Sequence, residues 1–523
     1  MSAAFQRRSR LLLRGGVVHA PGLPHATAMA IEDATITWIG DDAAAAHFAP
    51  DAHRVVDLDG ALVTPCFVDA HVHLAQTGLA ARGVGLYGVA TRDEALDRVA
   101  RHAVGTDDPI ILGFGWDETQ WGPGGTITRD EVDRAAPGRP AYLARVDGHS
   151  AVVSSALLER APELTTLAGW SADGRVERDA HHRARVAADR LVGPAMRTTA
   201  IRDALRAAAQ AGIGCVHEIG APHLSQLDDF ARIKAIRAGE PTPGVVCYWG
   251  EPGAYDAAAE HGCRGLAGDL CIDGSIGSRT AAMQEPYADA ADRRGHTYLD
   301  ETQVRDHVVG CTRRGLQAGF HVIGDRAFAA AAAGLRAAAA ELGVAAVTGA
   351  RHRLEHVEMV DGVGIALLAD LGVSASVQPA FDAAWGGDDR LYAARLGAQR
   401  AGAMNPFAAM AAAGVGLAFG SDSPVTPLAP WAGVRAAVQH RTPAQRLTVT
   451  AAFAAHTKGG WRAAGNDSAG CLAPGMPATY AVWDTHDTTG GALPELHPDV
   501  PLPLCTATVI DGVAVYNLEG ANL

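Results

Sequence analysis

The middle of the chain alternates short apolar segments with helical segments, and this alternation limits the possible folds more than any other feature. Each apolar segment has the length of a strand and ends in polar residues, and alanine-rich stretches such as 327–342 and 403–413 follow them. Eight strands are expected, at residues 66–73, 213–218, 244–249, 268–273, 318–323, 352–357, 373–378 and 416–422. Eight βα units are the number that closes a parallel barrel. The sequence therefore predicts an α/β fold built on a (β/α)8 TIM-like barrel, whose working residues lie at the carboxyl ends of its strands.

The two ends of the chain have a different pattern. Residues 11–64 and 480–516 both contain short strand-like runs separated by tight turns. The Asp511-Gly512 dipeptide lies between two such runs and predicts a hairpin. Neither end can bury a face alone, so we expect the two to pair. The predicted domains are a composite β-sandwich, residues 1–64 plus 468–523, and a barrel, residues 65–467.

The first and second barrel strands are separated by about 140 residues, far more than one crossover helix needs. An inserted subdomain is therefore expected at about residues 85–195. It contains the segments GFGWDE (113–118) and RVDGH (145–149), whose polar residues stand beside glycine-rich stretches.

Charge and composition argue against some classes of binding partner and indicate a cellular location. The 523 residues carry 44 basic and 58 acidic side chains, a formal charge of −14, which argues against a nucleic-acid or anionic-membrane partner. The eight cysteines form no CxxC pair and suit free thiols in a reducing cytosol. No run reaches the 18 apolar residues of a membrane span, and the apolar run before Arg14 is too short for a signal peptide. We expect a cytoplasmic protein.

Metal-binding side chains stand at four of the predicted strand ends. His71 and His73 are two residues apart on a strand and so face the same side. His321 ends the fifth strand, His356 the sixth and Asp422 the eighth. Each residue alone is weak evidence, because a histidine at a strand end is more often structural. Together they converge on one mouth of a barrel with the ligands that zinc prefers, and they predict a divalent metal site.

These motifs resemble those of the amidohydrolase superfamily, in the branch of YtcJ-like amidohydrolases and N-substituted formamide deformylases (amidohydrolase family 3). The matching segments are TPCFVDAHVHL (64–74), GFGWDE (113–118), VDGHSAVVSS (146–155), IDGSIGSRTAA (272–282), GFHVIGDRA (319–327), RHRLEHVEMV (351–360), SVQP (376–379) and FGSDSPVTP (419–427). The resemblance implies the barrel and the composite sandwich. It assigns His71 and His73 to one metal, His321 and His356 to a second, and Asp422 to the first metal and to proton transfer. Family habit also suggests a homodimer.

One position departs from that pattern. The family usually has a lysine on strand four that bridges two metals when carboxylated, and here the residue is Asp269. Neither lysine of this chain, Lys234 or Lys458, can replace it. The bridge then falls to Asp269, Glu218 or Cys271, or the site holds one ion on His71, His73 and Asp422, with His321 as third imidazole or proton relay. We favour one ion, and Asp269 is alternatively a buried carboxylate paired with an arginine.

The implied chemistry is hydrolysis of a C–N bond in a small amide, formamide or cyclic amide. A metal ion would activate water, and Asp422 would take its proton and pass it to the leaving nitrogen. His321 or His356 would stabilise the oxyanion. The alternative is a non-hydrolytic enzyme on the same scaffold, a decarboxylase, lyase or isomerase. A binding or scaffold protein is disfavoured because the ligand set is intact.

Substrate contacts are expected from the insertion and from the strand ends. The candidates are Trp116, Asp117, Glu118, Arg145, His149, Arg279, Gln378 and Trp385. Arg145 and His149 would bind a carboxylate or carbonyl, and Arg279 an acidic group. For each of them, structural packing or a surface ion pair is the alternative interpretation.

Overall fold

Eight parallel strands form the centre of the molecule in this computed structural model, which describes residues 9–122, 125–485 and 493–518. They are β7 (Phe67–Val72), β13 (Ile213–Gly220), β14 (Gly244–Trp249), β15 (Gly265–Leu266), β16 (Gln317–Val322), β17 (Arg353–His356), β18 (Ser374–Val377) and β19 (Leu417–Phe419). Each pairs in parallel with the next. A parallel bridge between Val72 and Ser423 brings the eighth strand back beside the first. The predicted eight-stranded barrel is confirmed.

Strand four is shorter and earlier than predicted. Its regular part is Gly265–Leu266, and the rest of the predicted strand 268–273 follows an irregular path with one bridge between Cys271 and His321. Gly268 explains the break, since its φ of 90° lies outside extended geometry, and a side chain there would collide with Ile219. The irregular segment carries Asp269 toward the barrel mouth.

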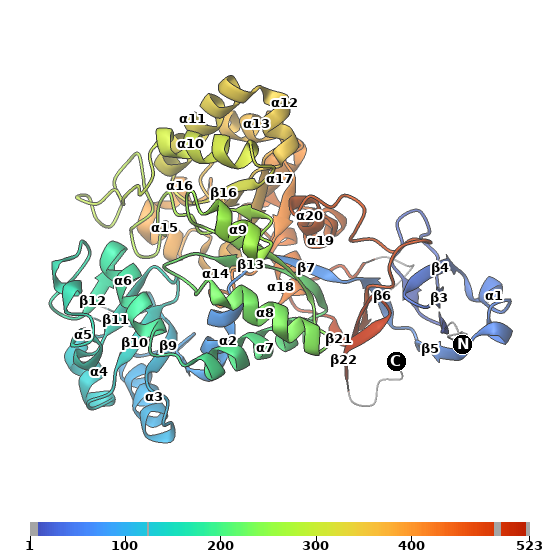
Figure 1. Cartoon of the computed structure of the whole chain (residues 1–523), viewed down its shortest axis with the longest axis horizontal. Coiled ribbons are helices and arrows are strands. Elements are labelled where there is room, and N and C mark those ends of the chain that lie inside the picture. The colour runs from blue at the N-terminus through green and yellow to red at the C-terminus, as the bar shows by residue number, and fades with distance from the viewer. Residues whose placement is uncertain (1–8, 123–124, 486–492, 519–523) are drawn as a thin grey trace.

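Helices surround the barrel (Figure 1). They are α2 (Leu74–Arg82), α7 (Pro194–Gln210), α8 (Asp228–Gly239), α9 (Tyr255–His261), α10 (Glu301–Thr312), α11 (Asp325–Leu342), α12 (Val344–Ala350), α13 (Gly362–Asp370), α14 (Pro379–Trp385), α15 (Leu391–Leu396), α16 (Ala398–Ala401), α17 (Phe407–Ala412), α18 (Pro430–Val438), α19 (Val449–Ala455) and α20 (Lys458–Ala463). The sequence specifies some of their boundaries directly. For example, Asp300 and Gln303 form a capping box that begins α10. Alanine and glycine let α11 approach α10 closely, because Gly334 lies directly against Val304.

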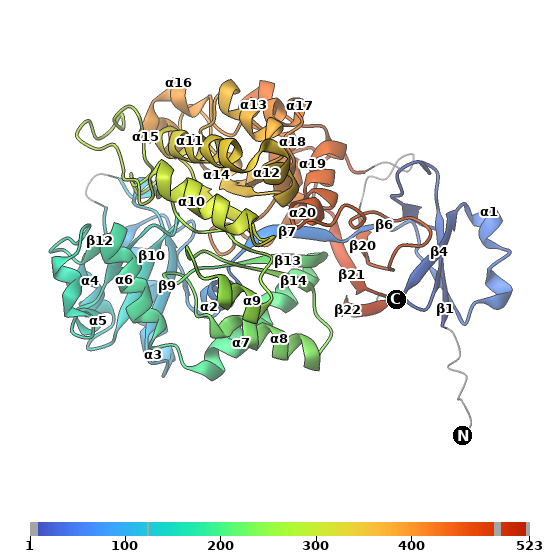
Figure 2. The same cartoon turned by 45° about the horizontal axis from the view of Figure 1, so that its top comes forward.

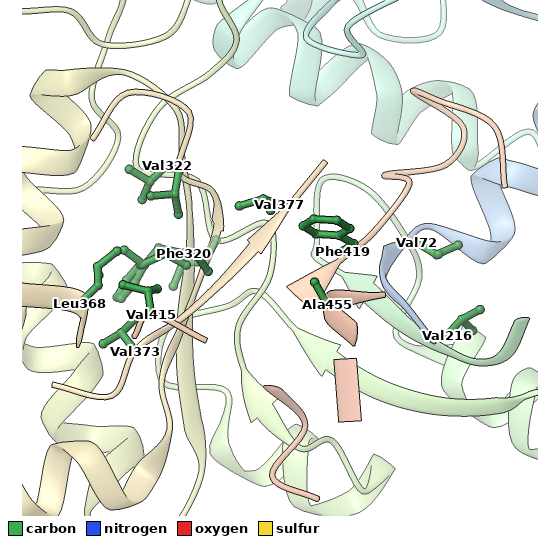
Figure 3. Packing of buried hydrophobic residues seen from close by; sticks show 14 of the residues in the cluster. Val72, Val216, Phe320, Val322, Leu368, Val373, Val377, Val415, Phe419 and Ala455 are labelled. Atoms are coloured by element: carbon green, nitrogen blue, oxygen red, sulfur yellow. The ribbon is translucent and has the colours of Figure 1, made fainter. Parts of the chain in front are cut away.

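The core lies between the barrel strands and these helices. Phe320, Val377 and Phe419 belong to one continuous buried cluster (Figure 3). Burial of each such side chain contributes about 1.5–3 kcal/mol. The barrel mouth is therefore presented by a rigid, close-packed scaffold.

Two sheets built from the ends of the chain lie beside the barrel (Figure 1). One contains β1 (Arg10–Arg14), β3 (Ala28–Glu32), β4 (Thr35–Gly40) and β5 (Arg54–Asp57), near the short helix α1 (Asp42–Ala45). The other joins β2 (Val17–Val18) and β6 (Leu62–Pro65) to β20 (Tyr480–Asp484), β21 (Leu504–Ile510) and β22 (Val513–Asn517). The last two strands form the expected hairpin, with Asp511 and Gly512 at φ 48° and 76°. Residues 1–8, 486–492 and 519–523 of the predicted sandwich lie outside the described residues.

The segment between β7 and α7 forms a separate unit on the side of the barrel away from that sandwich (Figure 2). Its sheet has the order β12-β11-β10-β9-β8. The strands are β8 (Val84–Gly85), β9 (Ile111–Trp116), β10 (Ala141–Arg145), β11 (Ser150–Val153) and β12 (Arg175–Glu177), and the helices are α3 (Arg92–Gly105), α4 (Arg129–Ala135), α5 (Ser155–Leu158) and α6 (Arg178–Asp189). The connection between β10 and β11 reaches the barrel, where Ser275 and Ser278 donate to Asp147 at 2.6 and 2.8 Å. The insertion therefore supplies part of the wall of the barrel mouth.

In the described ranges, no single helix has the length and hydropathy to cross a membrane. The pair α11 and α12 passes that test together, but it is bent by 118°. All eight cysteines are free thiols, as expected from their spacing.

Candidate metal centre

Four histidines and two aspartates converge at the carboxyl end of the barrel. His71 and His73 come from the end of β7, and their Nε2 atoms lie 3.5 and 3.3 Å from the two carboxylate oxygens of Asp269. Asp422, which follows β19, places its Oδ1 3.5 Å from His71 Nε2 and 3.1 Å from His73 Nε2. All four side chains are buried.

The second pair of imidazoles approaches the same carboxylate oxygen of Asp269 that lies near His71. Asp269 Oδ1 lies 3.5 Å from His321 Nδ1 and 3.8 Å from His356 Nε2. Three compact donor groups result: His71 with His73 and Asp269, His71 with His356 and Asp422, and Asp269 with His321 and His356. Asp269 therefore faces all four imidazoles.

Each imidazole uses its outward ring nitrogen for a hydrogen bond to the protein. The acceptors are Glu355 Oε2 for His71 (2.9 Å), the Ile219 carbonyl for His73 (2.8 Å), the Gly274 carbonyl for His321 (3.2 Å) and Gln378 Oε1 for His356 (2.8 Å). Such bonds fix the tautomer and the ring orientation of a metal-ligating histidine. The inward nitrogens are left as lone-pair donors that point at one space.

The inward atoms fit a cation. His71 Nε2, His356 Nε2 and Asp269 Oδ1 are fully buried and have no hydrogen-bond partner among the described residues, a costly state for buried polar atoms. Ligands held at 2.0–2.1 Å from a tetrahedral ion are separated by about 3.3 Å, close to the observed 3.1–3.8 Å. Neutral imidazole and carboxylate are the ligands of zinc and related divalent ions.

The ionised carboxylates of the site favour the binding of a cation. Burial opposes ionisation of Asp269, but the charge of His71 and the close approach of the His321 and His356 imidazoles outweigh it and hold the pKa of Asp269 well below its usual range. Burial also lowers the pKa of His73, yet Asp269 and Asp422 overcome this and raise that pKa to about 9. Without a metal, the two carboxylates thus hold a proton on His73, and a bound cation would displace it.

Two ligand positions have unusual backbone geometry. His356 has φ 69° and Asp422 has φ 55°, both in the left-handed region that non-glycine residues rarely adopt. At the end of β17 this turn breaks the alternation of the strand, so His356 and Glu355 both serve the centre. Strained backbone of this kind is concentrated at functional sites.

A buried ion pair between Glu355 and Arg353 orients the metal-facing His71. Glu355, the acceptor for His71, receives hydrogen bonds from Arg353 Nε at 2.5 Å and Arg353 Nη2 at 2.9 Å. Burial raises the pKa of Glu355, but the guanidinium and His71 lower it far more. Sequence reasoning missed both residues, although two charged side chains two apart on an apolar strand were a usable signal.

A family model described as the amidohydrolase family matches residues 54–516. The chain belongs to the amidohydrolase family. Protein LONG AFTER FAR-RED 3 of Arabidopsis thaliana is 29% identical to this amidohydrolase over 97% of the chain and 91% of its own length. YtcJ of Bacillus subtilis is 26% identical, covering 74% and 75% of the two chains. The N-substituted formamide deformylase of Arthrobacter pascens is 24% identical, covering 90% and 91%.

This amidohydrolase is also similar to solved structures. A metal-dependent hydrolase from Pyrococcus horikoshii OT3 is 25% identical, with a TM-score of 0.74 over 94% of this amidohydrolase and 99% of that chain. The predicted branch is confirmed, and the protein is a metal-dependent hydrolase whose His and Asp side chains form a divalent-metal site.

Of the three bridging candidates in this amidohydrolase, only Asp269 lies at the centre. Glu218 instead accepts a hydrogen bond from the Leu74 amide at 2.7 Å and supports the start of α2. Cys271 lies outside the donor groups, with Sγ 3.8 Å from His223 Nε2, and burial raises the pKa of its thiol well above the usual range. The expectation that either residue bridges metals is therefore corrected. No arginine pairs with Asp269 in the described part of the chain.

The cavity above the metal centre has two lobes. The polar lobe is lined by Tyr87, Tyr142, His149, His181, His182, Arg185 and His223, besides the metal-binding residues. The apolar lobe is lined by Ile276, Ile323, Phe381, Trp385, Leu391 and Tyr392. His149 belongs to both lobes, and its ring centroid lies 5.0 Å from that of His321.

The predicted substrate contacts divide between cavity and scaffold. His149 and Trp385 line the cavity as expected. Gln378 instead orients the metal-facing His356. Trp116 is wholly buried in the inserted sheet, where its Nε1 donates to the Leu143 carbonyl at 2.8 Å, so it is no pocket wall. Arg279 pairs with Asp289 at 2.7 Å and lines neither lobe.

The expectation that Arg145 binds a substrate carboxylate or carbonyl is also corrected. It lines the polar lobe, but three carboxylates surround its guanidinium. They are Asp117 at 3.2 Å, Glu118 at 2.8 Å and Asp147 at 3.1 Å. Because its charge is more than neutralised, Arg145 holds the insertion against the barrel and is a poor anion ligand. Glu118 and Asp117 therefore have a structural role as partners of Arg145, and not the predicted role in substrate binding.

Proposed function

We propose that this amidohydrolase hydrolyses a C–N bond of a small amide, formamide or cyclic amide, with two zinc ions that share Asp269. The observation that carries the metal count is the position of Asp269 between two pairs of imidazoles. A single four-coordinate ion would use four of the six donors and leave the others buried without partners. The proposal therefore revises the expectation of one ion.

Bound divalent ions would polarise the scissile carbonyl and lower the pKa of water. The protein supplies the proton transfers. The charges of His71 and His73 overcome burial and lower the pKa of Asp422, so this carboxylate is ionised at neutral pH. It can accept a proton from the attacking water and deliver it to the departing nitrogen, which needs one mobile carboxylate oxygen within reach of both.

His149 is suited to the carbonyl oxygen. Burial and the nearby His321 lower the pKa of His149 to about 3, so its imidazole is neutral and can donate a hydrogen bond without carrying a charge. We assign this role to His149 and not to His321 or His356, because the ring nitrogens of those two are committed to the metal centre and to protein acceptors.

The relatedness to an N-substituted formamide deformylase supports formamides as the first compounds to test. We further propose a cytoplasmic enzyme for a small-molecule substrate, possessing no nucleic-acid or membrane partner and forming a homodimer. The formal charge of −14 supports the exclusion of anionic partners.

The test is a screen of N-formyl, N-acyl and cyclic amides with mass analysis of products, which separates hydrolysis from decarboxylation or elimination. Asp422→Asn should lower kcat by about 10²- to 10⁴-fold. Metal content, measured in parallel, shows whether that loss comes from chemistry or from a vacant site. Full turnover in Asp422→Asn would refute the assigned proton transfer.

A further inference from the structure

One arginine of the polar lobe has no acidic partner. Arg185 lies on α6 of the insertion and lines the lobe. Its Nε donates to the Tyr142 hydroxyl at 3.3 Å, and its Nη2 donates to the Gly148 carbonyl. Both acceptors are neutral. Across residues 9–122, 125–485 and 493–518, Arg185 forms no ion pair with an aspartate or glutamate.

The Arg185 guanidinium has N–H groups that the described residues do not use. An arginine carries five N–H groups in a planar fork, and two of them are used by Tyr142 and Gly148. The remaining three have no partner within the described parts of the chain. The two existing bonds hold the fork in place, so a ligand would meet a preorganised donor group.

The other cations near the metal centre are neutralised. Arg145 is surrounded by carboxylates, as described above, and Arg395 pairs with Glu118 at 3.0 Å and Asp289 at 2.6 Å. Burial lowers the pKa of His182 to about 4, so this imidazole is neutral at pH 7. Of the two arginines that line this lobe, Arg185 is thus the one whose guanidinium faces no carboxylate among the described residues.

Its position relates it to the reaction centre. Arg185 contacts Gly148, and the next residue, His149, lies against the metal-binding His321. An anionic group bound by Arg185 would therefore lie a few bonds from a carbonyl bound at the metal centre. On the other side of His149, the apolar lobe offers Phe381 and Trp385, whose rings are 4.9 Å apart.

We infer that Arg185 determines specificity by binding a substrate carboxylate, and that the preferred amide carries this carboxylate on one side of the scissile bond and an apolar, aromatic group on the other. This inference rests on the proposed function. A carboxylate suits the site better than a phosphate because one guanidinium supplies a single charge and a bidentate fork.

A matched pair of non-hydrolysable ketones tests the inference on the metal-loaded, full-length enzyme. In 4-oxo-4-phenylbutanoate a methylene replaces the amide nitrogen of an aromatic N-acyl amino acid, and 1-phenylpentane-1,4-dione, in which a methyl ketone replaces the carboxylate, is its neutral counterpart. Titration calorimetry gives Kd for both. The wild type should bind the carboxylate about 10- to 100-fold more tightly than the neutral diketone, the usual effect of hydrogen bonds to a charged group.

Arg185→Gln should abolish that preference while leaving the Kd of the neutral diketone unchanged, which shows that the cavity is intact. Arg185→Lys should retain part of it, because the charge remains without the planar fork. Arg190→Gln is the matched control, since Arg190 is exposed at the end of the same helix and lines neither lobe. It should bind both ketones like the wild type.

Three results would overturn the inference: a wild type that binds neither ketone, or does not prefer the carboxylate; an Arg185→Gln variant that keeps the preference within twofold; or an equal loss in Arg190→Gln. Because binding of the ketones requires no turnover, failure of the proposed hydrolysis is seen separately. An enzyme that cleaves no C–N bond but shows the Arg185-dependent preference would refute the proposed reaction alone.

Discussion

Removing the charge of Glu355 should weaken metal binding and the fold by two separable routes. Glu355→Gln keeps the side-chain volume but removes the carboxylate that accepts from His71 at 2.9 Å and from Arg353 at 2.5 Å. The side chains of all three residues are fully buried. Arg353 would then keep uncharged partners: the His217 imidazole, the Ala70 carbonyl and the face of the Tyr248 ring.

The magnitudes follow from these contacts. Breaking a buried ion pair by removing one partner costs about 3–5 kcal/mol of stability, because the other charge stays buried. Loss of the group that orients a metal-ligating histidine lowers metal affinity about 10- to 100-fold. The pKa of Glu355 in the folded protein is lowered from its unfolded value of about 4.3, so the pair stabilises fully above that pH. The stability difference between variant and wild type should therefore shrink as the pH falls below about 4.3.

The two routes are separated by a second variant. Arg353→Met with Glu355→Gln removes both charges and should recover most of the stability, since a buried pair is nearly neutral against uncharged residues. Metal affinity should stay low, because His71 still lacks its carboxylate. Urea unfolding with chelator present measures stability, and competition with a chromogenic chelator measures zinc affinity. A double variant that recovers both, or a Glu355→Gln that binds zinc within twofold of wild type, would refute the reasoning.

Two further predictions concern the metal centre. The proposed pair of ions predicts that Asp269→Asn reduces bound zinc from two equivalents per chain to one or fewer by elemental analysis, and a variant that retains two would contradict the shared role of Asp269. In the metal-free protein, the pKa of His73 is raised to about 9, so its stabilising charge is complete below about pH 6.5 and is lost as the pH rises through 9. Zinc binding near pH 7 should consequently release protons, measured by calorimetry in buffers of different ionisation enthalpy; equal heats in all buffers would contradict this.

Much of the barrel and its ligands could be predicted because they depend on simple periods. His71 and His73 are readable from the two-residue repeat of a strand, and His321 and Asp422 from their places at strand ends. His356 was also predicted from its place at a strand end, but the role of its neighbour Glu355 at the end of β17 was not. There the left-handed backbone at His356 brings neighbouring residues to one site, and a side-chain period cannot predict such a turn.

The substrate cavity was predicted less well, because charge balance depends on contacts distant in sequence. Arg145 and Arg279 stand in conspicuous motifs, yet the fold pairs them with carboxylates. Arg185 stands among several arginines of α6 with no motif to mark it. Only the folded chain shows that the acidic residues of the described segments leave its guanidinium unpaired.

Asp269 also bears on how the enzyme becomes active in a cell. The family that the sequence resembles usually has a strand-four lysine at this place, which bridges two metals when it is carboxylated. Here the gene itself encodes the carboxylate that faces both pairs of imidazoles. Assembly of the centre should depend on the supply of metal and be indifferent to bicarbonate.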